Sequence, residues 1–105
     1  MKKEQILILQ EFADKVRTAY PKAQIWAFGS FARGSETVES DLDICVVLPD
    51  MESDDRLAVS DLAWEVGFGH DLHISTVVFS SKDFEKGPIS ASPLMNTIRS
   101  EGIAA

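Results

Sequence analysis

The chain has 105 residues, with 17 acidic and 10 basic side chains and a formal net charge of −7, and this length accommodates a single compact domain, residues 1–105. Eleven of the acids but only one base, Arg56, fall between Glu36 and Asp71. Such a surface repels phosphate backbones, which disfavours nucleic acid as the main partner but leaves room for a small triphosphate that carries its own metal ion.

The single cysteine, Cys45, excludes an intrachain disulfide and a thiolate metal cluster. No apolar stretch reaches the length of a membrane span, and the first residues do not resemble a signal sequence. We therefore expect a cytoplasmic protein that makes no contact with a membrane.

The first half of the chain predicts a helix followed by two strands. A helix is expected over residues 3–19, before Pro21, because apolar residues recur there at helical spacing, namely Ile6, Leu9, Phe12, Ala13 and Val16. The short apolar segment 24–28 predicts a strand that ends at Gly29. A turn-rich connection over 31–40 leads into a second strand, 41–48, which Pro49 ends.

The second half predicts a helix, a strand and a last helix. Residues 53–66 are expected to form a helix that Ser53 caps and Gly67 closes, with a buried stripe of Leu57, Leu62, Ala63 and Val66. A third strand is predicted over 71–79. Ser92-Pro93 then opens a helix that has Gly102 as its C-terminal cap and Leu94, Met95 and Ile98 on its inner face.

This order of elements favours a small α/β domain in which helices cover one face of a sheet. Three aromatic residues near the expected core, Trp26, Phe28 and Trp64, are interpreted as packing residues and not as platforms on which a nucleobase stacks.

Two carboxylates stand at the head of the second strand. Asp41 and Asp43 point the same way because side chains alternate along a strand, and their positions lie about 6.5–7 Å apart along it. The intervening and following apolar residues, Leu42, Ile44, Val46 and Leu48, point to the opposite side. Mg²⁺ prefers carboxylate oxygens and keeps positions open for phosphates, and two such ions can clamp the two oxygens of a phosphoryl transfer. The pair therefore predicts a magnesium site.

The segment 28–34, which runs from a strand through glycine into an expected helical turn, predicts a phosphate-binding loop. Gly29 lets the backbone approach a phosphate closely, and amides at the start of a helix attract its charge. Ser30 would hold a terminal phosphate, with Arg33 as a nearby cation. Neither this loop nor the Asp-x-Asp pattern is specific by itself.

Together the two motifs are specific. Gly29-Ser30, ten intervening residues and then Asp41-x-Asp43 reproduce the signature of the minimal nucleotidyltransferases, relatives of DNA polymerase beta, and the flanking segments 26–34 and 40–44 resemble that family as well. The resemblance implies a two-layer nucleotidyltransferase fold of the α+β type with a mixed sheet.

The resemblance also implies a function for the site. Gly29 and Ser30 would bind the phosphates of a nucleoside triphosphate, most plausibly ATP, and Asp41 and Asp43 would hold the metal ions. The reaction would transfer a nucleoside monophosphate from the triphosphate to a hydroxyl and release pyrophosphate.

One departure from the family pattern concerns its third carboxylate, on the next core strand. Alignment through the apolar run places that acid at His73, and imidazole is a poorer Mg²⁺ ligand but a possible general base. Asp71, two residues earlier, would share the face of His73 by alternation and could serve as the third acid if the register were shifted. The remaining reading is a surface histidine with no chemical role.

Three functions compete. Small members of the family commonly occur as antitoxins paired with an all-helical HEPN-type toxin, so the resemblance implies transfer of AMP onto such a partner. The departure at His73 favours instead a binding module that neutralises a partner by forming a complex. Nucleotidylation of a small molecule is the third, for which relatives use additional domains to hold the acceptor.

Overall fold

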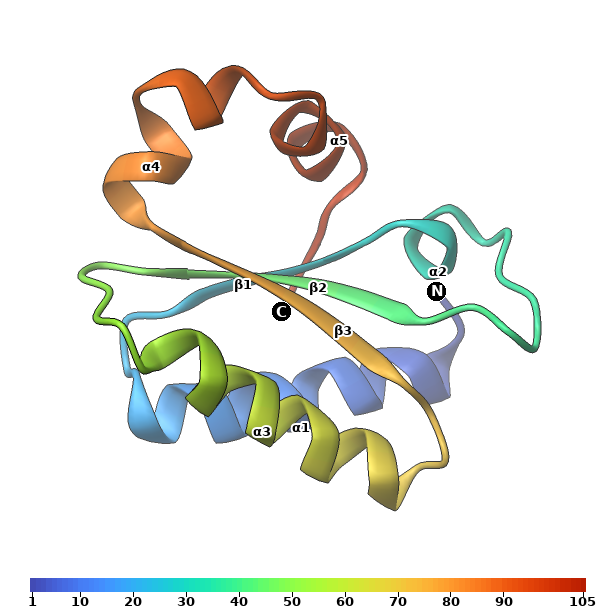
Figure 1. Ribbon diagram of the computed structural model, residues 1–105. Helices are drawn as coiled ribbons and strands as arrows, with labels where there is room; N and C mark the ends of the chain where they lie inside the picture. Colours follow the sequence, from blue (N-terminus) through green and yellow to red (C-terminus); the bar gives the residue numbers. More distant parts are fainter.

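The computed structural model describes residues 1–105 and has a four-stranded sheet at its centre, in the order β3-β2-β1-β4 (Figure 1). β1 (Gln24–Phe28) pairs antiparallel with β2 (Leu42–Leu48) and with the short β4 (Ile103–Ala104). β2 pairs in parallel with β3 (Ile74–Ser80). The sheet is therefore mixed, as expected for a small α+β fold, and β3 and β4 form its two edges.

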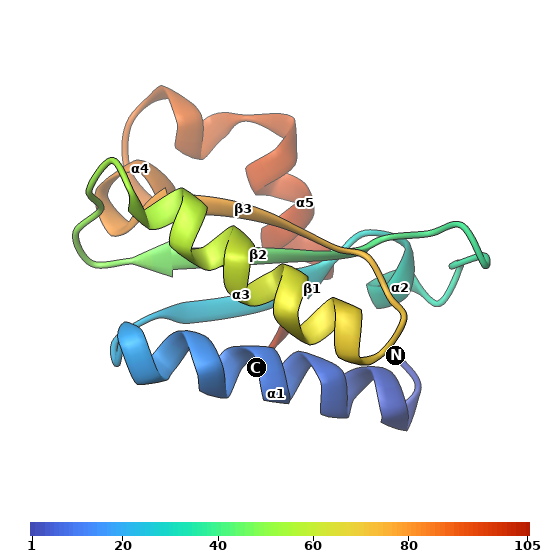
Figure 2. The same cartoon turned by 60° about the horizontal axis from the view of Figure 1, so that its bottom comes forward.

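Two long helices, α1 (Lys3–Ala19) and α3 (Asp55–Gly69), lie side by side against one face of the sheet (Figures 1 and 2). Their inner residues meet the side chains that β2 points toward them. Fully buried members of this main core are Leu9, Phe12, Val16, Ile25, Leu42, Ile44, Val46, Leu48 and Val59. Burial of each large apolar side chain contributes about 1.5–3 kcal/mol, so this layer holds the sheet in place.

The other face of the sheet is also covered in part. α4 (Ser81–Glu85), a 3-10 turn (Pro88–Ala91) and α5 (Pro93–Glu101) fold across it. A second cluster of buried residues forms there, made of Phe28, Cys45, Val47, Met95 and Ile98. The expectation of helices on one face alone missed this cover, because β2 is apolar on both of its sides from Ile44 onward.

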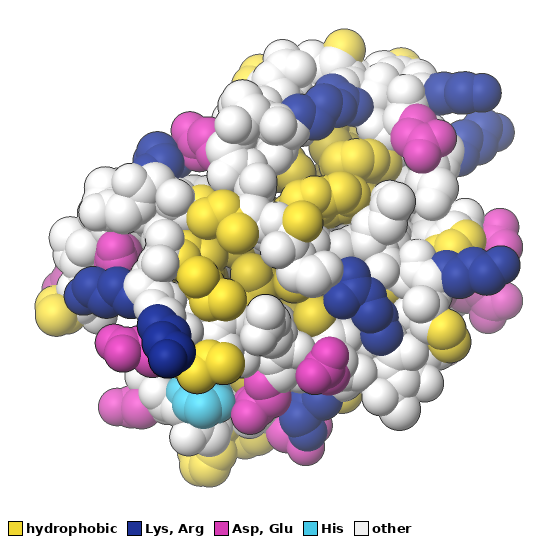
Figure 3. Space-filling model, turned by 180° about the vertical axis from the view of Figure 1, so that it is seen from behind, with side chains coloured by type: hydrophobic (Ala, Val, Ile, Leu, Met, Phe, Trp, Pro, Cys, Tyr) yellow, Lys and Arg dark blue, Asp and Glu magenta, His cyan; other side chains and the backbone are white.

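The C-terminal helices leave a hollow beside β1. It has a volume of about 240 Å³ and is lined by Trp26, Phe84, Ile98, Arg99 and Gly102. Trp26 and Phe84 stack with their ring centroids 5.2 Å apart. Figure 3 shows hydrophobic side chains gathered in a recess on the face opposite to that of Figure 1, with Lys and Arg side chains around it.

The start and the end of α3 differ from expectation. The helix begins at Asp55, and Ser53 does not cap it; instead the Asp55 carboxylate accepts a hydrogen bond of 2.7 Å from the Glu52 amide. Gly67 does not close the helix, which continues to Gly69. Gly67 is buried, and a β-carbon there would collide with the Leu72 carbonyl oxygen, so this glycine permits close packing of the helix on the turn that follows.

Several residues expected in the core face solvent. Leu57 and Trp64 on α3 are exposed by 64% and 68%, and Ile6 and Leu94 are also exposed. The other residues expected in the core of these helices are buried or packed against it, and on α3 Val59 is buried in place of Leu57. None of the helices combines the length and the apolar character that crossing a bilayer requires.

Candidate active site

The phosphate-loop glycine packs directly against a carboxylate of β2. Because β1 and β2 are antiparallel, Phe28 lies opposite Asp43, and Gly29 follows at the start of α2 (Ser30–Arg33). Gly29 has φ of +78°, a conformation that side chains rarely adopt. A β-carbon there would collide with Asp43 Oδ2 and lie 3.3 Å from Asp43 Cγ. The fold thus requires glycine at this position and brings the loop and the carboxylate into contact.

The two carboxylates flank Leu42, which is fully buried against the main core. Asp43 is half-buried and Asp41 is exposed. Burial raises the pKa of Asp43 above its usual range, the charge of Asp41 raises it further, and Arg33 and His73 oppose the increase. A half-buried carboxylate beside a second one is the arrangement that a bound cation stabilises.

His73 is brought to this site by the pairing of β2 with the segment before β3. The amide of Leu42 donates to the His73 carbonyl oxygen over 2.9 Å. The His73 side chain is exposed, and its Nε2 lies 3.9 Å from Asp41 Oδ2. His73 therefore lies beside Asp41 in the fold.

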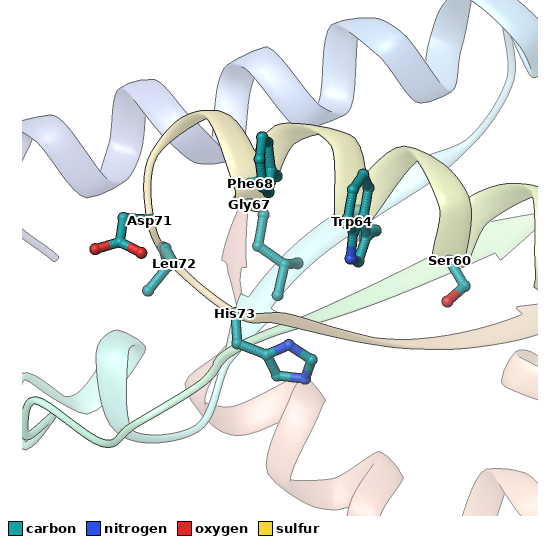
Figure 4. A pocket seen from close by; sticks show the side chains of 9 residues that line it. Ser60, Trp64, Gly67, Phe68, Asp71, Leu72 and His73 are labelled. Atoms are coloured by element: carbon teal, nitrogen blue, oxygen red, sulfur yellow. The ribbon is translucent and has the colours of Figure 1, made fainter.

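Asp71 occupies a different environment. The third strand begins at Ile74, not at residue 71, so strand alternation does not apply to Asp71, which lies in a turn with φ of +52°. Figure 4 shows its carboxylate at the turn between α3 and β3, directed away from His73. The geometric reason for expecting Asp71 on the face of His73 is thus wrong, because the backbone turns at residue 71.

Arg33 links the loop to the C-terminal helix. Its Nη1 lies 3.0 Å from Glu101 Oε2 at the end of α5. Both side chains are partly exposed, so the pair contributes little to stability. The charge of Arg33 nevertheless acts on Asp43, which places a cation within electrostatic reach of the carboxylates.

Comparison with known proteins agrees with this geometry. The family model described as a nucleotidyltransferase domain matches residues 9–101, which is most of the chain. The chain belongs to this nucleotidyltransferase family. The expectation of a nucleotidyltransferase enzyme is confirmed at the level of the family, and no curated protein sequence matches the chain.

Solved structures share the fold of this nucleotidyltransferase. A toxin–antitoxin with AMP-PNP matches with a TM-score of 0.61 and 22% identity over 90% of this chain and 69% of that one. A tri-AMPylated HEPN toxin of Shewanella oneidensis in complex with MNT antitoxin matches with a TM-score of 0.57 and 21% identity, over 95% and 70% of the two chains. A nucleotidyltransferase from Sulfolobus solfataricus matches with a TM-score of 0.55 and 20% identity, over 95% and 80%.

The donor atoms of this nucleotidyltransferase suit Mg²⁺. No group of three His, Cys, Asp or Glu side chains comes close enough to enclose a metal by itself. Asp41 and Asp43 would supply carboxylate oxygens and leave other positions to water and substrate phosphates, which is how Mg²⁺ is usually held. The raised pKa of Asp43 fits this assignment, since a cation would offset both the burial and the repulsion by Asp41 that raise it.

Ser75 is a neighbour of the candidate site that the motif search did not find. The parallel register pairs Asp43 with Ser75, and the next residues toward the start of the strands pair Leu42 with Ile74. Side chains at paired positions of neighbouring strands share a face, so the half-buried Ser75 lies beside Asp43. Only the register of β2 against β3 reveals this position, because no motif surrounds Ser75.

Proposed function

We propose that this nucleotidyltransferase transfers AMP from ATP, in the presence of Mg²⁺, to a hydroxyl group on a partner protein in the cytoplasm. The observation that carries the proposal is the contact between Gly29 and the Asp43 carboxylate. It puts the loop that would hold phosphates next to the residues that would hold the metal ions.

In this proposal the loop residues bind phosphate, the two carboxylates hold the metal and His73 takes a proton. Backbone amides at Gly29 and Ser30, at the start of α2, together with the Ser30 hydroxyl bind the β- and γ-phosphates, and Arg33 adds a positive charge. Asp41 and Asp43 would hold Mg²⁺, which would supply positive charge against the phosphates. His73 Nε2 accepts the proton of the attacking hydroxyl as a general base.

The reaction is balanced by one bond formed and one broken. The acceptor oxygen bonds to the α-phosphorus of ATP while the bond from that phosphorus to the bridging oxygen of pyrophosphate breaks. Pyrophosphate leaves, and the hydroxyl proton passes to His73. Asp71 stays a candidate for the third acid only if the turn at residue 71 rearranges when substrate binds.

The proposed partner is a HEPN-type toxin, with this chain as its antitoxin. Support comes from the structural neighbours, one of which is an MNT antitoxin in complex with a tri-AMPylated HEPN toxin and another a toxin–antitoxin with AMP-PNP. AMP-PNP in that neighbour also supports ATP as the nucleotide.

The test is a labelling reaction with α-phosphate-labelled ATP, Mg²⁺ and lysate from the source organism. Wild type should label one acceptor, whereas γ-phosphate-labelled ATP should give no label. The double variant Asp41→Asn/Asp43→Asn should give none with either. Asp14→Asn, which removes an exposed carboxylate of α1, serves as the matched control and should label as wild type does. Equal labelling by the double variant would refute the proposal.

A binding module is the second candidate, and the histidine in place of a third carboxylate favours it. Such a protein would neutralise its partner by forming a complex, without chemistry. Lysate that yields a partner complex with the wild-type chain but no label from any of the four α-labelled nucleoside triphosphates would support this alternative.

A further inference from the structure

The solvent-facing side of α3 carries an unusual set of apolar residues. Leu57, Trp64 and Phe68 are exposed by 64%, 68% and 76%, and the rings of Trp64 and Phe68 stack with centroids 5.1 Å apart. Spacings of seven and four residues place all three on one stripe of the helix, which we call the outer α3 face. Val59 and Ala63 are buried on the opposite side, so burial against the sheet does not explain these three residues.

A groove separates the outer α3 face from the edge of the sheet. A cavity of about 500 Å³ lies between Trp64, Phe68 and the residues that lead into β3 (Figure 4). A second hollow of about 390 Å³ continues along β3 over Thr76–Phe79, and Ser60 lines both. β3 is an edge strand, so backbone groups on its outer side have no strand partner within the chain. Such an edge pairs readily with a segment of another chain.

The charges around the groove indicate the chemistry of its occupant. Five acids stand between Asp54 and Asp71, but the single base there, Arg56, lines the hollow over β3, and of the five acids only Asp71 lines either hollow. Glu65 is paired with Lys15, but neither Asp61 nor Asp71 forms an ion pair. The preference among occupants therefore comes from the net charge of −7 and from Asp61, which helical spacing places on the outer α3 face: a second copy of this chain or an anionic membrane would be repelled, whereas a basic segment would be attracted.

The groove adjoins the candidate active site. His73, whose Nε2 lies 3.9 Å from Asp41 Oδ2, also lines the cavity beside Trp64 and Phe68. In Figure 4 the Trp64 and Phe68 rings lie on the α3 side of the strand and the His73 side chain on its other side. A protein segment can contact both sides of the strand at once.

We propose that the outer α3 face and the groove along β3 form the docking surface for a basic protein segment with apolar anchor residues. Trp64 and Phe68 receive the anchors, and Asp61 and Asp71 face its Lys or Arg side chains. The three apolar residues expose roughly 400 Å², which is half of what one partner contributes to a stable interface of standard size. That such a segment belongs to the acceptor of nucleotidyl transfer rests on the proposed function; the docking surface itself does not.

The test uses synthetic peptides of Leu and Lys, one patterned as a strand and one as a helix, and matched peptides in which Glu replaces Lys. Binding is followed by NMR of the two tryptophan indole groups. At least one Leu/Lys peptide should shift the Trp64 signal and leave Trp26 unchanged, and the Leu/Glu peptides should shift neither. Trp64→Ala/Phe68→Ala should weaken binding by about tenfold or more, whereas Leu7→Ala, which removes an exposed apolar residue of α1, should not.

Three results would overturn the proposal. One is the absence of any shift at Trp64 with either Leu/Lys peptide, and another is equal binding by the Trp64→Ala/Phe68→Ala variant, which would reduce the effect to net charge. The third is self-association of the free protein in sedimentation that this variant abolishes, because a second copy would then be the occupant. Asp41→Asn/Asp43→Asn should bind the peptides like wild type, so loss of nucleotidyl transfer and loss of docking are separate outcomes.

Discussion

Replacement of Gly29 by alanine tests whether close approach of the phosphate loop to Asp43 is what the site needs. Gly29 has φ of +78° and ψ of −156°, a region that is essentially restricted to glycine, and an alanine there costs about 1–3 kcal/mol. The new β-carbon would also displace the Asp43 carboxylate, with which it collides. A displacement of about 1 Å at a catalytic group can reduce the rate about a hundredfold.

Gly34 provides the matched control. It also has positive φ, +76°, but no atom lies within 4 Å of a β-carbon built there. Gly34→Ala should therefore cost about 1–2 kcal/mol through the backbone alone. For a domain of this size each kcal/mol lowers the Tm by about 4–8 °C, so both variants should melt lower than wild type by a comparable amount.

The assay compares Tm by circular dichroism with the affinity for ATP and Mg²⁺ by calorimetry and with labelling by α-labelled ATP, all at a temperature where both variants are folded. Gly34→Ala should keep binding and labelling near the wild-type level, whereas Gly29→Ala should lose labelling about a hundredfold. If the two variants lost labelling activity equally, or if Gly29→Ala stayed active, the contact with Asp43 would not be the reason for glycine here.

Three further predictions concern the rest of the fold. Cys45 is fully buried and burial raises its pKa to about 12, so iodoacetamide at pH 8 should leave it unmodified in the folded protein and alkylate it in denaturant, as mass spectrometry would show; rapid modification of folded protein would contradict the packing of the second cluster. Phe12→Ala in the main core should cost about 3–5 kcal/mol of unfolding free energy in urea titrations, against less than about 0.5 kcal/mol for the exposed Leu7→Ala. Tyr20→Phe removes the hydrogen bond of 2.8 Å from the Tyr20 hydroxyl to Asp55; the Glu52 amide and then this bond lower the Asp55 pKa, and the same bond is the main cause that raises the Tyr20 pKa. The Tm difference from wild type should therefore be present between about pH 4 and pH 10 and disappear as pH falls through the Asp55 pKa or rises above about 10. A difference that persists at low pH would show that the bond to the carboxylate is not its source.

Features that depend on residues near one another in the chain were predictable. The bounds of α1 and β1 follow from local apolar spacing and from Pro21 and Gly29, and the structure reproduces both. Ser92 caps α5 by accepting a hydrogen bond from the Met95 amide, as its place before Pro93 predicts. The motif is likewise confined to β1, β2 and the segment between them, so its spacing alone was enough to predict the family.

Tertiary structure decided what depends on pairing between distant segments. The chain turns at residue 71, where Gly67 packs against the Leu72 carbonyl, and β3 begins only at Ile74. Strand alternation therefore does not place Asp71 on the same face as His73. The parallel register of β3 against β2 places Ser75 beside Asp43. The burial of Val59 in place of Leu57 also could not be read from the pattern of α3, because apolar residues occur on both of its faces and only contact with the sheet selects between them. A local pattern specifies which faces of an element are apolar, whereas the choice among them is made by the packing of the whole domain.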